Sequence, residues 1–170
     1  HLVDSGSRVL GTMGERSSEK AEKFLKELDV HIWLNMRVTD YDGNKAVTDK
    51  EKTFHTSTLI WAAGVMGVSI PGIPVSAILP NGRIAVDVCN LVEGSSNIYA
   101  VGDAAQMKTD EFPKGHPQVA QVAIQQARQL GKNMASGKEK LSWAAFRYKD
   151  LGSMATIGRN RAVVETKSIK

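Results

Sequence analysis

The chain has 170 residues, of which 42% are hydrophobic and 24% charged, and it carries a formal net charge of +4. This composition is typical of a folded globular protein, and the scattering of Lys and Arg among Asp and Glu argues against a nucleic-acid partner. The apolar runs are too short for a membrane helix, so a soluble chain is expected, and the lone cysteine, Cys89, rules out an internal disulfide or a multi-cysteine metal site.

The first part of the chain is expected to combine strands with one helix. In residues 17–28 the apolar side chains fall at helical spacing behind Ser17, which predicts an amphipathic helix capped by that serine. Residues 30–38 alternate apolar and polar side chains, the pattern of a half-buried strand. The other predictions are the end of a strand at 1–4, a turn at Asp42-Gly43, a short strand at 45–48, and a buried strand at 58–63 that runs into Gly64.

The second part follows a segment rich in proline and glycine, residues 67–82, which predicts a crossover between two units. Residues 97–101 are a compact apolar run and predict a strand that ends at Gly102. A periodic stretch from about 118 to 135 predicts a helix that starts at Pro117, where proline suits the first turn. Shorter strands are predicted at 84–86, 155–157 and 162–165.

Asp103 directly follows one of these predicted strands, and ligands of open α/β sheets bind beyond such strand ends. Its carboxylate could accept charge-assisted hydrogen bonds from the hydroxyls of a sugar or ribityl chain. The alternative is a plain turn in which Asp103 caps its own backbone, and the residue types leave both interpretations open. The helix predicted from Pro117 would direct its first amides to the same place and favour an anionic ligand edge, such as a reduced flavin.

Four segments in chain order carry a resemblance to one family. The run Asn-Ile-Tyr-Ala-Val-Gly-Asp at 97–103 resembles the flavin-contacting strand of pyridine-nucleotide-dependent flavoproteins. Residues 120–126 are similar to the Ala-Gln-x-x-x-Gln motif of type II NADH:quinone dehydrogenases. Residues 58–65, with Trp-Ala-Ala-Gly, and residues 148–158 resemble further segments of the same enzymes. The chain therefore resembles the C-terminal part of such a dehydrogenase.

The resemblance implies an α/β fold with parts of two Rossmann-like dinucleotide-binding units plus a small mixed C-terminal segment. Residues 1–66 would belong to the NADH-binding unit, 67–82 to the crossover, 83–136 to the FAD-binding unit, and 137–170 to a region at the interface and membrane side. The implied activity passes a hydride from NADH to FAD and electrons on to a membrane quinone, without proton pumping. The implied location is the cytoplasmic side of a cell membrane, with peripheral attachment through C-terminal helices that this chain lacks, and a homodimer stays open.

The resemblance also implies roles for single residues in holding the cofactors. Asp103 would bind the ribityl chain of FAD. Asp4, near the end of a strand, would accept the ribose hydroxyls of NADH. The other residues implied to contact a cofactor are Gly64, Gly102, Ala120, Gln121 and Val122.

Gln121 and Gln125 are the residues that the resemblance assigns to the quinone end. They lie one helical turn apart on one face, and an amide can donate to a quinone carbonyl. The alternative for both is an ordinary solvated helix face. His116, in the preceding loop, is a candidate proton relay, with a solvated histidine as its alternative. No pair of histidines has ligand spacing, so no metal site is expected.

Two features depart from the family pattern. No Gly-x-Gly-x-x-Gly loop is present, so the pyrophosphates of FAD and NADH would lack their cradle within this chain. Leu151 stands where many of these dehydrogenases carry a lysine, and Lys149 is two positions away. We therefore expect the chain by itself to be inactive. The alternative is a non-catalytic interaction or regulatory module derived from the same flavoprotein fold.

Overall fold

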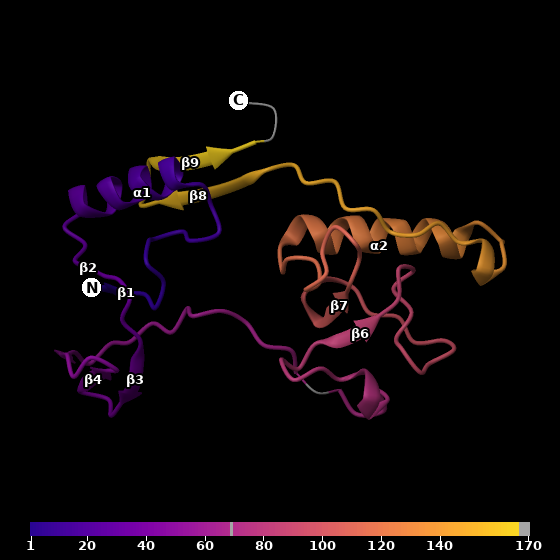
Figure 1. The fold of residues 1–170 in the computed structure, drawn as a ribbon, viewed down its shortest axis with the longest axis horizontal. Coiled ribbons are helices and arrows are strands. Elements are labelled where there is room, and N and C mark those ends of the chain that lie inside the picture. Colours follow the sequence, from indigo (N-terminus) through magenta and orange to yellow (C-terminus); the bar gives the residue numbers. More distant parts are fainter. Residues whose placement is uncertain (69, 167–170) are drawn as a thin grey trace. The chain divides into compact units, whose positions relative to one another are not determined.

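The computed structural model describes residues 1–68 and 70–166, and its mixture of helices and strands confirms the predicted α/β class. The chain divides into two compact units, and Figure 1 labels both α-helices and most of the strands. One unit combines residues 1–63 with the chain from residue 151 onward, and the other spans residues 64–150. These units are defined by how the chain packs and not by which cofactor each part binds. The limits expected for the nucleotide-binding units, at residues 66, 82 and 136, therefore remain a prediction.

The first unit contains a parallel strand pair joined through a helix. β1 (Leu2–Val3) pairs with β2 (Ile32–Trp33), and α1 (Glu15–Glu27) lies between them in the sequence. The antiparallel hairpin of β8 (Ser153–Ile157) and β9 (Arg161–Glu165) packs on α1. Apolar side chains from the helix, the hairpin and the loop before the helix form one core, whose buried members are Val9, Met13, Ala21, Ile157 and Val163.

The same unit also carries a three-stranded antiparallel sheet of β3 (Val38–Tyr41), β4 (Lys45–Thr48) and β5 (Thr53–His55). The predicted turn between β3 and β4 is confirmed. There the Asp42 carboxylate accepts hydrogen bonds from the N–H groups of Asn44 and Lys45, both at 2.9 Å, and these bonds lower the pKa of Asp42.

The second unit contains a second parallel pair and the longer helix. β6 (Ile84–Val86) pairs with β7 (Ala105–Met107), and α2 (Ala120–Ala135) follows β7 in the chain. Three short 3₁₀ helices complete it: η1 (Val75–Ala77), η2 (Gly102–Ala104) and η3 (Lys140–Ser142). The buried core consists of Ala77, Ile84, Val86, Val92, Ala105, Met107 and Phe146.

Both helices begin at residues other than those the sequence indicates. α1 begins at Glu15, so the predicted Ser17 cap is wrong. The cap residue is Gly14, whose N–H donates to the Glu165 carboxylate at 2.7 Å. α2 begins at Ala120 and Pro117 lies outside it. At the start of α1, the side chain that accepts a main-chain N–H therefore comes from Glu165 in the distant strand β9 and not from a neighbouring residue. A contact of this kind leaves no signal in the local sequence.

The strands predicted at 45–48, 84–86, 155–157 and 162–165 are confirmed, but three longer predictions are wrong. The run 30–38 is broken at Asn35, whose φ of +52° is incompatible with a continuous strand. Residues 58–63 form no strand, and Ile60 and Trp61 are 85% and 64% exposed. Residues 97–101 pair only through one bridge, between Leu91 and Tyr99.

Candidate functional site

The turn that carries Asp103 is pressed against helix α2. Gly102 has a φ of +68°, and its N–H donates to Oε1 of the buried Gln126 at 2.7 Å. A Cβ at Gly102 would lie 2.9 Å from the Cβ of Ala123, closer than carbon atoms tolerate. Glycine is therefore required both for the backbone conformation and for the close approach.

The Asp103 side chain is exposed at this turn, beside the start of α2. The main-chain carbonyl of Asp103 accepts a hydrogen bond from the Gln118 side chain at 3.2 Å. Among the described residues, no backbone N–H is capped by the Asp103 carboxylate, in contrast to Asp42 and Asp87, which each accept two backbone hydrogen bonds. The carboxylate is thus available to hydroxyl groups of a ligand.

The first turn of α2 lies next to the same turn. Ala120 is exposed, Gln121 is half-buried and Val122 is buried, so Ala120 and Gln121 are the residues of this turn that a ligand could reach. The N–H groups of Val122 and Ala123 are bonded to the Val119 carbonyl. The helix N-terminus still concentrates partial positive charge there, which favours an anionic or electron-rich ligand edge.

Gln125 is used in a way that the sequence does not indicate. Its side-chain amide donates to the Lys149 carbonyl and accepts from the Lys149 N–H, both at 2.9 Å. Two turns further along, the buried Asn133 forms the same pair of bonds with Ala144, at 2.9 and 3.1 Å. We call residues 144–149 the strap, because these two amides hold that segment along α2.

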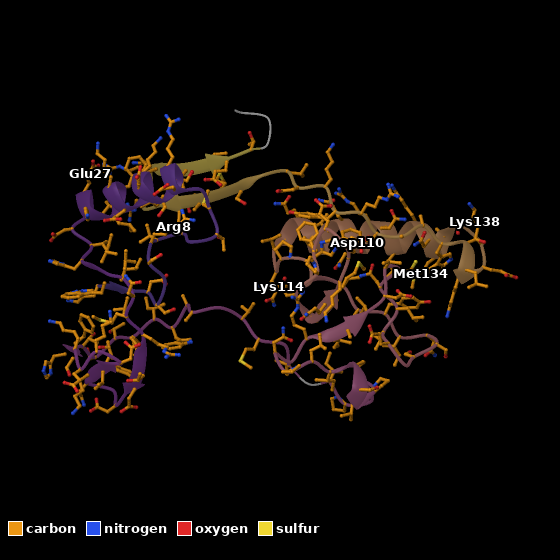
Figure 2. The ribbon with its side chains drawn as sticks, in the orientation of Figure 1. Arg8, Glu27, Asp110, Lys114, Met134 and Lys138 are labelled. Carbon is orange, nitrogen blue, oxygen red and sulfur yellow. The ribbon has the colours of Figure 1, made fainter. Side chains whose placement is uncertain are left out.

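Aromatic side chains from the strap and from the loop before α2 form a cluster around His116. Figure 2 labels Asp110 and Lys114, which lie in that loop. His116 is only 3% exposed, and its ring centroid lies 4.5 Å from that of Phe112, 5.3 Å from Phe146 and 5.8 Å from Tyr148. Neither ring nitrogen has a hydrogen-bond partner in the described chain. The solvated alternative for His116 is therefore wrong, and burial lowers the pKa of its imidazole.

Arg83 is a site residue that sequence reasoning missed. It is 7% exposed, and its Nη2 donates to the main-chain carbonyls of Ala105 and His116. Burial lowers the pKa of the guanidinium, while the negative charge of Asp103 raises it. In the sequence Arg83 is an ordinary arginine directly before a predicted strand, and nothing near it indicates burial. Its position among main-chain carbonyls is therefore seen only in the structure.

The remaining predicted site residues are Asp4 and Gly64. The Asp4 side chain is exposed in the first unit, and its Oδ1 accepts a hydrogen bond from the Gly6 N–H at 2.7 Å. Gly64 is exposed at the start of the second unit with a φ of +101°, and no atom lies within 4 Å of where its Cβ would be. Their proposed part in binding NADH stays a prediction.

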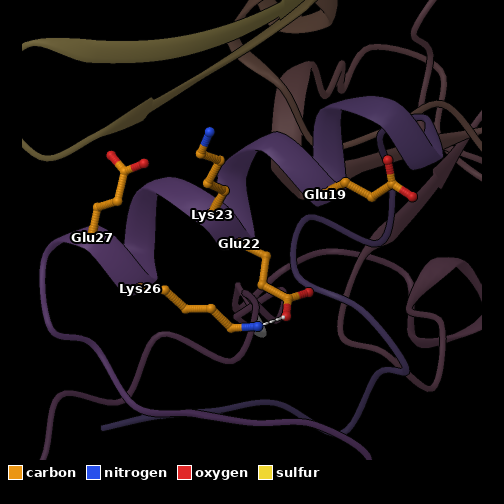
Figure 3. A pocket seen from close by; sticks show the side chains of 5 residues that line it. All are labelled: Glu19, Glu22, Lys23, Lys26 and Glu27. Atoms are coloured by element: carbon orange, nitrogen blue, oxygen red, sulfur yellow. Dashed lines mark ion pairs between the residues drawn. The ribbon is translucent and has the colours of Figure 1, made fainter.

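An open hollow on α1 is lined by Glu19, Glu22, Lys23, Lys26 and Glu27, as Figure 3 shows. Nζ of Lys26 lies 2.6 Å from a Glu22 carboxylate oxygen, one turn away. Charges of both signs on an exposed helix face are typical of solvated surface and indicate no ligand.

No group of metal-ligating side chains occurs in the described part of the chain. Across residues 1–68 and 70–166, the helices are too short or too polar to span a bilayer.

Comparison with known proteins relates the whole chain to flavoprotein reductases. A family model described as pyridine nucleotide-disulphide oxidoreductase matches residues 1–127. A type II NADH:quinone oxidoreductase of Mycobacterium tuberculosis is 35% identical, over 99% of this chain and 37% of that protein. A type II NADH:quinone oxidoreductase of Haemophilus influenzae is 27% identical, over 95% of this chain and 36% of that protein. The chain thus spans little more than a third of either relative.

The fold has a solved counterpart in NDH2 from Plasmodium falciparum in complex with NADH. The two superpose with a TM-score of 0.84 over 98% of this chain and 49% of that chain. Their sequence identity is 20%, so this likeness concerns the fold.

Proposed function

The chain belongs to the pyridine nucleotide-disulphide oxidoreductase family, and on that premise we propose that it is part of a type II NADH:quinone oxidoreductase. The proposed enzyme passes a hydride from NADH to FAD and electrons on to a membrane quinone, without pumping protons. The observation that carries the proposal is the packing of the Asp103 turn against the start of α2, in the two segments whose sequences resemble such enzymes. The similarity to the type II NADH:quinone oxidoreductases of Mycobacterium tuberculosis and Haemophilus influenzae supports it.

The residues at this turn fit the ribityl and ring portions of a flavin. Gly102 lets the turn approach α2, so that the exposed Asp103 carboxylate can accept hydroxyl hydrogen bonds beside the positive end of the helix. Ala120 and Gln121 would lie against the ring system, with the buried Val122 packed behind them. FAD, when bound, would supply the redox chemistry, and these protein groups would hold it and stabilise its negative charge.

Gln121 and Gln125 would have different roles at the quinone end of the site. The Gln121 amide would donate to a quinone carbonyl. Gln125 is bonded twice to Lys149, so its part would be to hold the strap beside the quinone. Asp4 would accept a ribose hydroxyl of NADH with the carboxylate oxygen that Gly6 does not use.

The test is Gln121→Ala in a full-length protein that carries this chain. We expect it to slow quinone reduction about ten-fold while ferricyanide reduction changes little, because losing one positioned hydrogen bond costs about that factor. Arg128→Ala, at an exposed position of α2, is the control. Equal loss with both acceptors would exclude Gln121 from the quinone site.

The proposed location is the cytoplasmic side of a cell membrane, with peripheral attachment, because a membrane quinone must reach the site. Sedimentation of the full-length protein with vesicles tests the membrane attachment.

We expect the 170-residue chain alone to be inactive, and NADH oxidation by that chain would contradict this expectation.

A further inference from the structure

Arg83 is the only buried lysine or arginine in the described part of the chain. It directly precedes β6, and its main-chain N–H donates to the Asn81 side chain at 3.1 Å. Burying a guanidinium costs free energy that apolar residues at this place would avoid. A buried arginine therefore calls for an explanation beyond packing.

A single nitrogen of Arg83 joins the two segments that form the proposed flavin site. Nη2 donates to the carbonyl of Ala105, the first residue after the η2 turn that carries Asp103. It also donates to the carbonyl of His116, at 3.3 Å, in the loop that leads into α2. The bridge thus ties the Asp103 turn to the approach of the helix N-terminus.

The charge of Arg83 is only partly compensated. No carboxylate lies within ion-pair distance of it in residues 1–68 and 70–166, and its buried Nε has no hydrogen-bond partner there. Asp103 is the acidic residue whose charge acts on it. Its positive potential therefore extends toward the Asp103 turn, where it adds to that of the helix N-terminus.

We propose that Arg83 is a positioning residue of the flavin site, which fixes the Asp103 turn relative to the start of α2 and whose charge favours the bound cofactor in its more negative, reduced form. This inference rests on the proposed function, because it requires that FAD binds at the Asp103 turn. It assigns two separable properties to one side chain: the bridge sets the affinity for FAD, and the charge sets the reduction potential.

Two variants of the full-length protein separate these properties. Arg83→Lys keeps the charge on a shorter side chain, whose ammonium would fall short of the two carbonyls. Arg83→Met removes both charge and bridge at similar length. The dissociation constant of FAD and the midpoint potential of the bound flavin are measured for each. The exposed Arg128 on α2 provides the matched control, Arg128→Met.

We expect Arg83→Lys to weaken FAD binding by about ten-fold or more, because both hydrogen bonds that fix the Asp103 turn are lost, with the midpoint potential nearly unchanged. Arg83→Met should weaken binding at least as much and make the potential more negative, and Arg128→Met should alter neither quantity. Wild-type affinity and potential in both Arg83 variants would overturn the inference. Equal shifts of potential in both variants would overturn its electrostatic half.

If Arg83→Met does not fold, Arg83→Gln, which also removes the charge, takes its place in the measurement of the midpoint potential, and an unchanged potential there contradicts the electrostatic half. Wild-type affinity in Arg83→Lys still contradicts the bridge. A wild-type protein that binds no FAD would instead refute the proposed function itself. The two failures are therefore distinguishable from the same set of measurements.

Discussion

At Gly102 the absence of a side chain decides how closely two segments of the site can pack. We predict that Gly102→Ala lowers the free energy of unfolding by about 2–3 kcal/mol, the sum of left-handed backbone strain and overpacking against Ala123. Gly43→Ala is the matched control, because Gly43 has a φ of +95° but open space around it. It should cost only about 1 kcal/mol. Urea unfolding measures both, and equal losses would contradict the close contact.

His116 makes the stability of the second unit sensitive to acid. Burial lowers the pKa of its imidazole from the ordinary 6.5, an effect that Glu111 opposes and Arg83 reinforces. The folded state therefore binds fewer protons than the unfolded state at low pH, so stability is present above the ordinary pKa and is lost as pH falls below it.

We predict that His116→Phe removes this loss between about pH 7 and pH 5. It should also raise the free energy of unfolding at neutral pH by about 1 kcal/mol, because it eliminates buried nitrogens that lack partners. Urea unfolding across that pH range measures both effects, with the exposed His55→Phe as control. An unchanged pH dependence in His116→Phe would show that other groups cause the acid sensitivity.

At the scale of elements, α2 holds the strap through the polar side chains of Gln125 and Asn133. Asn133→Ala would leave the N–H and carbonyl of Ala144 without their partners. We predict a loss of about 2–3 kcal/mol in the free energy of unfolding. The neighbouring Lys132→Ala, on the exposed side of the helix, should be nearly neutral. A loss below about 0.5 kcal/mol for Asn133→Ala would contradict the role of Asn133 in holding the strap.

Elements that depend on local contacts could be predicted from the sequence, and elements that depend on distant partners could not. The turn at Asp42 and the strand 45–48 depend on neighbouring residues, and both are confirmed. The run 58–63 has the apolar composition of a buried strand, but within residues 1–68 and 70–166 it pairs with no strand, and Ile60 and Trp61 are exposed. Apolar composition predicts burial only where a partner is present.

The same division holds in the candidate site. The pairing of the Asp103 turn with α2 could be anticipated, because a strand end and the next helix N-terminus meet in α/β folds. The contacts of Arg83, Gln125 and Asn133 could not, since each side chain bonds to main-chain atoms that any sequence provides.

At the scale of the whole molecule, the proposed function requires one property: a full-length protein carrying this chain must bind a flavin that NADH reduces and a quinone reoxidises. The family match and the packing of the Asp103 turn against α2 both support that property. The most direct measurement is an anaerobic titration of the purified full-length protein, followed by its visible absorbance. We predict that NADH bleaches a bound flavin and that a short-chain quinone then restores its spectrum. A purified, folded protein without flavin absorbance, or a flavin that NADH leaves oxidised, would contradict the account.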